Sequence, residues 1–350
     1  MTDQQAMARA IELSKGGYPA PNPHVGCVIV REGQIVAEGF HDHAGGPHAE
    51  VVALEQAGML ARGATAYVTL EPCNHHGRTP PCSEALIAAG VSRVVIANPD
   101  PYPRAMGGSE KLAANGIKVE VGCLGDEARA ANEQFFFALE HKRPLVVLKV
   151  AMSLDGRIAL PGGESQWITG ELARLEGHRL RAELGAVLVG RTTVIKDDPL
   201  LTARIPGVVN QPARIVLDPK GQLGGHEKMF GPEAPSWRVV GDGVENGDLQ
   251  VPYADVELDL QFLLEELYRR QITGVLVEGG SKTVGHFIKR NLFDRLVLFV
   301  GPKLLGQGTS WLDQHLASTL SAVPQLRIEE VRTIGKDLML VLTNASGTFF

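Results

Sequence analysis

The sequence predicts an α/β protein with two domains, and three observations support this. Short apolar runs typical of strands alternate along the chain with segments whose apolar residues recur at helical spacing. A chain of 350 residues suggests two domains at about 150 residues each. The polar stretch His141-Lys142-Arg143-Pro144 separates two parts that both show the alternation. We therefore expect one domain over residues 1–144 and another over residues 145–350.

The first part begins with a helix, which Met7, Ala10 and Ile11 predict over residues 4–15. Two apolar runs joined by a turn at Gly33 then predict a hairpin of strands. Strand and helix patterns alternate from there to the polar stretch. The predicted strands cover residues 25–30, 35–37, 66–70, 94–97 and 119–122, and the further helices cover residues 48–57, 83–89, 110–115 and 126–141.

The second part opens with a strongly apolar strand over residues 145–151, which only Lys149 interrupts. Residues 220–248 hold seven glycines and few apolar runs, so we predict a loop-rich segment there. The remaining predicted helices cover residues 171–184 and 283–289, and the remaining strands cover residues 186–189, 214–217, 275–277, 296–300 and 338–342.

The composition excludes several classes of protein. With 44% apolar and 21% charged residues, the chain is not collagen-like, disordered or a coiled coil. Its formal charge of −6 does not suit a protein that coats nucleic acid. The opening residues do not resemble a signal peptide, and no apolar run approaches the ~18 residues that span a bilayer. Four cysteines are too few for a secreted disulfide scaffold, so we expect the reducing cytoplasm, with Cys27 and Cys123 as core residues.

Three short motifs predict a zinc site: His48-Ala49-Glu50, Glu71-Pro72-Cys73 and Pro81-Cys82. A catalytic zinc takes three protein ligands and leaves one position open for water. One imidazole and two thiolates balance the charge of the ion, and a bound water can then ionise near neutral pH. His48, Cys73 and Cys82 are the candidate ligands. Glu50 is too close in sequence to His48 to be a comfortable second ligand, so it is the candidate proton carrier.

The pattern H-x-E followed by P-C is the signature of the zinc nucleobase deaminases. Their usual C-x-x-C is replaced here by a nine-residue step from Cys73 to Cys82. On spacing alone, His75 or His76 could compete as a ligand, although we expect both to line the pocket. The alternatives are a closed structural zinc site and a pair of unliganded buried thiols. A zinc protease is disfavoured, because the chain contains no H-E-x-x-H.

Polar residues also gather where predicted strands of the second part end, which is where open α/β sheets bind ligands. Lys149 stands out, because lysine is rarely buried without a partner; the alternative is a solvated lysine on an edge strand. Arg181 and Arg204 are candidates for contacts with a phosphate or a ring. Gly279-Gly280 would let backbone N–H groups approach a phosphate at a helix start, and the alternative is a plain tight turn. The Lys and Ser/Thr of a Walker A loop are missing after these glycines, so an ATPase is rejected.

Seven runs along both halves resemble the bifunctional riboflavin-biosynthesis deaminase–reductase family. They are PNPHVGCVIV, GPHAEVVAL, GATAYVTLEPCNHHGRTPPC, KVAMSLDGRIAL, GESQWITG, DDPLLTAR and VLVEGG. The nine-residue cysteine spacing belongs to this family. The resemblance implies a three-layer, cytidine-deaminase-like first domain and a second α/β domain similar to dihydrofolate reductase. It also implies zinc-dependent hydrolytic deamination of 2,5-diamino-6-(5-phosphoribosylamino)pyrimidin-4-one. NADPH-dependent reduction of the ribosyl group would follow, giving 5-amino-6-(5-phosphoribitylamino)uracil.

The resemblance assigns roles to individual residues as well. It implies zinc on His48, Cys73 and Cys82, with Glu50 as the proton shuttle. Asn22 and His41 match positions that hold the deaminase substrate. The positions that match cofactor contacts are Ala151, Trp167, Thr193, Asp197, Gly280, Ser281, Lys282, Thr283, Val284, Gly285 and His286. The positions that match reductase-substrate contacts are Lys149, Ser165, Arg181, Leu201, Arg204 and Glu278. Tyr102 is a departure, because the family usually has asparagine there.

We therefore expect a small phosphorylated pyrimidine as substrate, with one zinc ion per chain and NADPH as cofactors. We expect no nucleic-acid or membrane partner, and a homo-oligomer is left open. One rival function is a nucleic-acid deaminase with an appended binding domain, against which the charge of −6 argues. Another is a deaminase whose second half only binds a ligand or dimerises; NADPH oxidation would exclude it. The third is a structural zinc protein, which ammonia release from an aminopyrimidine would exclude.

Overall fold

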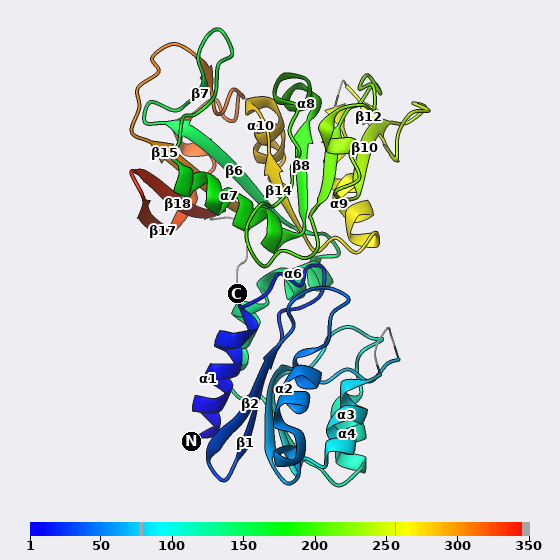
Figure 1. Cartoon of the computed structure of the whole chain (residues 1–350). Helices are drawn as coiled ribbons and strands as arrows, with labels where there is room; N and C mark the ends of the chain where they lie inside the picture. Colours follow the sequence, from blue (N-terminus) through cyan, green and yellow to red (C-terminus); the bar gives the residue numbers. More distant parts are fainter. Residues whose placement is uncertain (77–79, 256, 345–350) are drawn as a thin grey trace. The chain divides into compact units, whose positions relative to one another are not determined.

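The structure is a computed structural model that describes residues 1–76, 80–255 and 257–344. Part of the segment between Cys73 and Cys82, and the last six residues of the expected second domain, lie outside the described residues. The chain divides into two compact units, residues 1–141 and residues from 142 onward (Figure 1). Both units combine helices with a sheet, as expected. The expected domain boundary after Pro144 stays a prediction.

The first unit is built on a five-stranded sheet in the order β2-β1-β3-β4-β5. Strand β1 lies between β2 and β3 and pairs antiparallel with both, whereas β3, β4 and β5 run parallel. The expected hairpin is therefore confirmed. The strands are β1 (Gly26–Arg31), β2 (Gln34–Phe40), β3 (Thr65–Leu70), β4 (Arg93–Asn98) and β5 (Lys118–Val121).

Helices cover both faces of this sheet, so the three-layer architecture is confirmed (Figure 1). Successive side chains of a strand point to opposite faces. Accordingly, Val28 and Val30 pack in the cluster that contains α1, whereas Cys27 and Ile29 pack in the cluster that contains α2. The helices are α1 (Asp3–Ser14), α2 (Ala49–Ala57), α3 (Cys82–Ala89), α4 (Gly108–Ala114), α5 (Gly125–Ala131) and α6 (Glu133–His141), with a 3₁₀ turn at Gly58–Ala61.

The helical structure expected over residues 126–141 is confirmed apart from a break at Asn132, which divides it into α5 and α6. The backbone of Asn132 leaves the helical region, with φ −118° and ψ 22°. Its side-chain amide accepts a hydrogen bond from the backbone N–H of His24 and donates one to the backbone carbonyl of the same residue. Asparagine side chains that bond to backbone compete with helix geometry in this way. The partner is 108 positions away in sequence, so helical periodicity could not reveal it.

The second unit is built on a nine-stranded sheet in the order β11-β10-β9-β8-β14-β6-β15-β18-β17. The strands from β11 to β15 run parallel, and β18 and β17 are added antiparallel at one edge. The strands of this sheet are β6 (Leu145–Ser153), β8 (Ala186–Gly190), β9 (Ala213–Leu217), β10 (Ser236–Gly241), β11 (Leu249–Val251), β14 (Gly274–Glu278), β15 (Arg295–Gly301), β17 (Leu326–Ile334) and β18 (Asp337–Asn344). Two short ribbons pair β7 (Arg157–Ala159) with β16 (Thr309–Ser310) and β12 (Tyr253–Ala254) with β13 (Glu257–Leu258).

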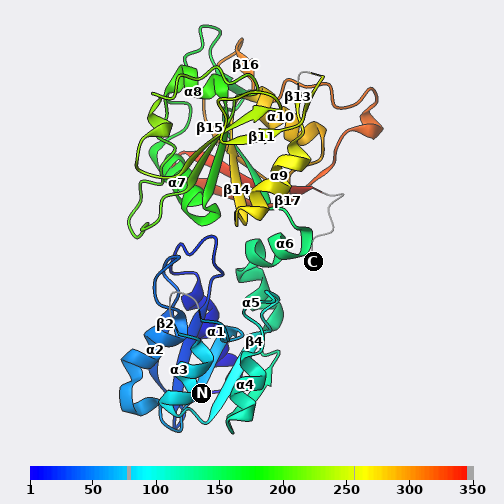
Figure 2. The ribbon, with the colours of Figure 1, turned by 90° about the vertical axis from the view of Figure 1, so that its right-hand side faces the viewer.

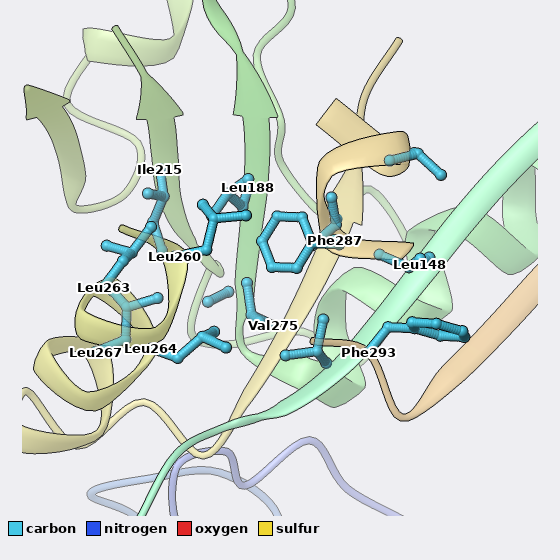
Figure 3. Close-up of a cluster of buried hydrophobic side chains, with 14 of the residues drawn as sticks. Leu148, Leu188, Ile215, Leu260, Leu263, Leu264, Leu267, Val275, Phe287 and Phe293 are labelled. Carbon is cyan, nitrogen blue, oxygen red and sulfur yellow. The ribbon is translucent and has the colours of Figure 1, made fainter. Parts of the chain in front are cut away.

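Four helices flank this sheet: α7 (Glu171–Leu184), α8 (Arg191–Asp197), α9 (Leu260–Arg269) and α10 (Ser281–Lys289). Figure 2 shows α7 and α8 on one face, and α9 and α10 on the other. The Asp259 side chain caps α9 by accepting a hydrogen bond from the backbone N–H of Phe262, at 3.0 Å. Leucines of α9 then line one side of the helix and pack with Phe287 of α10 against the sheet (Figure 3). The described chain also has 3₁₀ turns at Lys228–Phe230 and Leu320–Ala322.

The structure of the second unit differs from the sequence-based expectations in two places and excludes one alternative. The segment 220–248 is not only loop, because it contains β10, in which Val239 and Val240 are buried. Strand β17 was not expected, because it lies at the sheet edge and is exposed along nearly its whole length. Its sequence therefore lacks a clean apolar alternation. The alternative of an edge strand around Lys149 is excluded, since β6 lies between β14 and β15.

Candidate active sites

The first candidate site is a cluster of His48, Cys73 and Cys82, whose possible ligand atoms all lie within 4.8 Å of one another. His48 Nδ1 lies 3.2 Å from Cys82 Sγ and 3.6 Å from Cys73 Sγ. In a tetrahedral zinc site with Zn–N near 2.0 Å and Zn–S near 2.3 Å, neighbouring ligand atoms lie about 3.6 Å apart. The donor set and its spacing therefore fit zinc. His75 and His76, the alternative ligands, are exposed and lie outside this group.

Two helix starts and one strand end position the cluster. His48 is the N-cap of α2, Cys82 is the first residue of α3, and Cys73 follows β3. The backbone N–H of Cys82 points to Cys73 Sγ at 3.4 Å. Helix N-termini carry partial positive charge, which favours thiolates. Hydrogen bonds from Cys82 and His48 hold the pKa of the Cys73 thiol well below its usual value, against the opposing effect of burial.

Glu50 lies in the first turn of α2, two residues after His48, and its side chain is buried. Burial raises the pKa of this carboxyl to about 6, although the nearby His48 opposes the shift. A carboxyl with a pKa near neutrality can both accept and return a proton during a reaction at pH 7. The geometry thus gives Glu50 the properties expected of a proton carrier.

Asn22 and His41 form a hydrogen-bonded pair beside the cluster. Asn22 Nδ2 and His41 Nε2 are 3.0 Å apart, and the His41 ring meets the His48 ring edge-on, with centroids 5.3 Å apart. Burial lowers the pKa of His41, so its ring is neutral at pH 7. Its Nδ1 lies 3.0 Å from the Pro47 carbonyl oxygen and must donate there. Its Nε2 then accepts from the Asn22 amide.

The loop that follows β4 is held against the cluster by Glu71. Its carboxylate accepts hydrogen bonds from the backbone N–H groups of Asp100 and Ser109, at 3.1 Å and 2.8 Å. In this loop, Ala105 and the half-buried Tyr102 pack with the two cysteines. Sequence reasoning quoted Glu71 only as a neighbour of Cys73, and its role in holding this loop depends on distant backbone groups that periodicity does not reveal.

The second candidate site lies at the carboxyl ends of β8, β14 and β6. Glu278 on β14 is in register with Lys149 on β6, so both side chains rise on the same face of the sheet. Arg181 of α7 binds Glu278 through two parallel hydrogen bonds, Nε to Oε1 at 2.8 Å and Nη2 to Oε2 at 2.6 Å. Paired guanidinium–carboxylate contacts of this kind are strong and directional. The expected partner of Lys149 is therefore a carboxylate that also binds an arginine.

The charges of this cluster depend on one another. Burial disfavours the ionised form of Glu278, but the positive charges of Arg181 and Lys149 outweigh it and lower the pKa of Glu278 to about 2. Burial likewise lowers the pKa of Lys149, and Glu278 opposes that shift. The Lys149 ammonium also lies 5.8 Å from the centre of the Phe299 ring. Glu278 is thus an ionised, largely buried carboxylate, 13% exposed, that balances two cations.

We expect Glu278→Gln to lower the free energy of unfolding at pH 7 by about 3 kcal/mol, because breaking a buried ion pair leaves an uncompensated charge. The folded-state pKa of Glu278 lies below its ordinary value of 4.5, so its stabilisation is present above pH 4.5 and is lost as the pH falls toward 2. Urea unfolding should show the difference from wild type shrinking over that range. Glu245→Gln, at an exposed loop position, is the control; an equal loss in the control would contradict the prediction.

Leu201 and Arg204 lie in the segment after α8, and α7 holds this segment. Arg181 Nη1 donates to the Thr202 carbonyl oxygen at 3.0 Å, and Arg204 Nη1 donates to Thr202 Oγ1 at 3.0 Å. Leu201 is buried and has a φ of 55°, which is rare for a residue other than glycine. The arginines predicted from sequence and Glu278 therefore belong to one connected cluster.

The start of α10 fits a phosphate group. Its N-cap Gly280 provides no side-chain cap, and a Cβ built there would meet nothing within 4 Å. A Cβ on Gly279 would lie 2.8 Å from Thr283 Cβ, and one on Gly190 would lie 2.5 Å from Thr283 Oγ1. Only glycine fits at these two positions, where β8, β14 and α10 converge. Uncapped N–H groups at a helix start attract phosphates.

Other predicted contacts of this site are less closely tied to one another. Ala151 lies two residues after Lys149 on β6, and Thr193 and Asp197 lie on α8, with Asp197 exposed. Trp167 is 60% exposed, with the Arg174 guanidinium 4.3 Å from the centre of its ring. Within the described part of the chain, no hydrogen bond joins Ser165 or Trp167 to the Glu278 cluster. Their assigned roles stay predictions.

Sequence reasoning missed His178, which lies next to the Arg181 cluster. Its ring contacts Thr202 and Arg204. The available signal was the spacing His178-x-x-Arg181 within a predicted helix, because residues three apart share a helix face.

Two family models match the chain. The cytidine and deoxycytidylate deaminase zinc-binding region matches residues 1–98, which include all three residues of the metal-binding cluster. The RibD C-terminal domain matches residues 144–340, more than half of the chain. Within the described residues, no helix has the length and apolar character needed to cross a membrane.

Curated relatives match nearly the whole chain. The riboflavin biosynthesis protein RibD of Aquifex aeolicus (strain VF5) is 43% identical over 347 residues, which cover 97% of each chain. The protein of the same name from Escherichia coli (strain K12) is 41% identical over 367 residues, which cover 99% of this chain and 100% of that protein.

Solved structures match to a similar extent. Acinetobacter baumannii RibD has a TM-score of 0.88 at 41% identity, with 98% of this chain and 99% of that chain covered. A diaminohydroxyphosphoribosylaminopyrimidine deaminase/5-amino-6-(5-phosphoribosylamino)uracil reductase from Thermotoga maritima has a TM-score of 0.85 at 39% identity, with the same coverage.

Proposed function

The chain belongs to the RibD family of bifunctional riboflavin-biosynthesis enzymes, and from this membership we propose how its two units divide the work. It is a deaminase and a reductase in one chain, and it carries a zinc-binding deaminase domain. We assign deamination to the first unit and reduction to the second. The proposed substrate is 2,5-diamino-6-(5-phosphoribosylamino)pyrimidin-4-one, and the proposed product is 5-amino-6-(5-phosphoribitylamino)uracil.

In the first unit, His48, Cys73 and Cys82 would hold zinc, which lowers the pKa of a water molecule at its open position toward neutrality. Glu50 accepts a proton from the water that attacks the pyrimidine carbon bearing the exocyclic amine. It passes that proton to the ring nitrogen and then carries the remaining hydroxyl proton to the departing nitrogen, so that ammonia leaves and a carbonyl remains. Asn22 and His41, paired beside the cluster, orient the pyrimidine ring.

In the second unit, the start of α10 would hold a phosphate of NADPH, which supplies hydride for the former anomeric carbon of the opened ribose. Ala151, Trp167, Thr193 and Asp197 are the further proposed cofactor contacts. Lys149 and Glu278, which are in register on neighbouring strands, would face the ribose, and Arg181 fixes Glu278. Ser165, Leu201 and Arg204 are the remaining proposed substrate contacts, with Arg204 on the phosphate or ring because guanidinium suits anions.

One observation carries the two-step proposal: two distinct polar clusters, one of metal-ligand type and one built around the Arg181–Glu278 ion pair, lie in separate compact units. The test follows ammonia and NADPH absorbance in one reaction with the purified zinc-loaded chain. The diaminopyrimidine ribotide should release ammonia without NADPH, and should oxidise NADPH when it is added. Ammonia release without NADPH oxidation would mean that the second unit is a non-catalytic module. The absence of both ammonia release and NADPH oxidation would contradict both assignments.

Arg204→Ala should separate the two activities. We expect it to raise the KM of the reductase for the deaminated ribotide about tenfold or more, because it removes a charged contact worth roughly 1.5–3 kcal/mol. Ammonia release should stay at the wild-type rate, because Arg204 lies in the second unit. Steady-state kinetics of both reactions are the measurement. An equal loss of both activities would point to misfolding or a shared site.

A further inference from the structure

His178 contacts the segment that carries Arg204. It lies on α7 three residues before Arg181, so both side chains project from the same face of the helix. His178 Nδ1 is 3.1 Å from the Thr202 carbonyl oxygen and 3.3 Å from the backbone N of Arg204. Arg181 Nη1 donates to the same Thr202 oxygen at 3.0 Å. Helix α7 therefore holds this segment through two side chains.

Side chains satisfy the backbone throughout this segment. The Gln211 amide accepts from the Ala203 N–H at 2.8 Å and donates to the Ala203 carbonyl oxygen at 3.1 Å. The residue before Thr202 is Leu201, whose φ of 55° is unfavourable for a branched side chain. A conformation of this kind persists only when the surrounding contacts hold it in place. The position of Arg204 thus depends on contacts from His178, Arg181 and Gln211.

The charges around His178 favour its neutral form. Burial, and after it the positive charges of Arg181 and Arg204, lower the pKa of the imidazole, and the contact with the Thr202 carbonyl and the charge of Glu278 oppose this only in part. A neutral imidazole has one donor nitrogen and one acceptor nitrogen. With the proton on Nδ1 the ring donates to Thr202, and with the proton on Nε2 the ring accepts from the Arg204 N–H. In either tautomer Nδ1 is the atom that holds the segment.

We propose that His178 is a positioning residue of the reductase site, whose Nδ1 holds the segment Thr202–Arg204 so that the Arg204 guanidinium reaches the anionic part of the substrate. The proposal rests on the reductase function proposed for the second unit. His178 acts through Arg204, whose side chain is itself bonded to Thr202 Oγ1. It fixes the direction of a cation without touching the reacting carbon.

Three substitutions test which ring nitrogen matters. Leucine removes both nitrogens, asparagine places an amide near the position of Nδ1, and glutamine places one near the position of Nε2. In the full zinc-loaded chain, we expect His178→Leu and His178→Gln to raise the KM for the deaminated ribotide about tenfold, the effect of one lost hydrogen bond. His178→Asn should restore most of it. The KM for NADPH and the rate of ammonia release should not change in any variant.

Hydrogen exchange of the peptide that contains residues 202–204 tests the contact without relying on activity. His178→Leu should speed exchange of the Arg204 amide, and His178→Asn should not. Unchanged KM and exchange in His178→Leu would overturn the proposal, as would equal losses in the leucine and asparagine variants. If wild type fails to oxidise NADPH, the proposed reductase function fails, whereas the exchange result still decides the contact.

Discussion

Glu50→Gln should bind zinc as wild type does and release ammonia at least about 100-fold more slowly, the usual contribution of a positioned acid–base group. The amide has nearly the shape of the carboxyl, so it fits the buried position in α2. It cannot accept a proton from water or return one to the departing nitrogen. The three candidate ligands are untouched, so loss of rate without loss of metal is the expected signature.

The measurement combines zinc content by elemental analysis with ammonia release under saturating substrate. Glu55→Gln is the matched control, because Glu55 lies on the same helix but is exposed. NADPH oxidation with the deaminated ribotide should be normal in both variants. Near-normal ammonia release by Glu50→Gln would remove this residue from the mechanism, and loss of zinc would make it a ligand or a structural support.

Cys73→Ala should lose zinc and all measurable deamination. Only two of the three clustered donors remain, and a catalytic zinc site needs three protein ligands. Removal of one thiolate also leaves the site with a net positive charge around the ion. Reduction of the deaminated ribotide should continue, since the second unit has its own core and none of the three ligands. Elemental analysis and the two activity assays are the measurements.

Cys123→Ala is the control for the loss of a thiol in the same unit. Its thiol is half-buried against the α1 side of the sheet and lies outside the metal-binding group. This variant should keep zinc and both activities. Full zinc occupancy in Cys73→Ala would show that another residue completes the site. His75 and His76, only two and three positions further on, would then be the first to examine.

The sequence predicted the helices and strands whose apolar residues recur with a clear period. It also predicted that the three residues of the candidate metal-binding cluster lie close together. The candidate ligands His48 and the two cysteines lie in short sequence motifs, so residue type and spacing alone could suggest a zinc site. The break at Asn132 could not be predicted, because its cause is a backbone group of His24 far away in sequence. The exposed strand β17 was missed because a register shift between Ile328 and Glu330 interrupts its apolar alternation, and its pairing comes from β18 alone.

The second site was predicted less completely. Lysine inside an apolar strand indicated a buried charge, but its partner Glu278 became apparent only from the register of β6 and β14. Arg181 was expected to bind a ligand, and that role stays a prediction. The sequence did not indicate that its side chain also donates to a carboxylate and a carbonyl of the chain itself. His178 was overlooked because its contacts are with backbone atoms of a segment more than twenty positions away.

The junction after α6 bears on any attempt to separate the halves. Arg143 donates to both carboxylate oxygens of the buried Asp294 at 2.7 Å, and that carboxylate also accepts from the N–H of Val146. A recombinant fragment that starts at Leu145 would lack this guanidinium and leave an anion in the protein interior without its counter-charge. A fragment that starts at Lys142 would retain it. We therefore expect an isolated C-terminal half that starts at Lys142 to be more stable than one that starts three residues later, at Leu145.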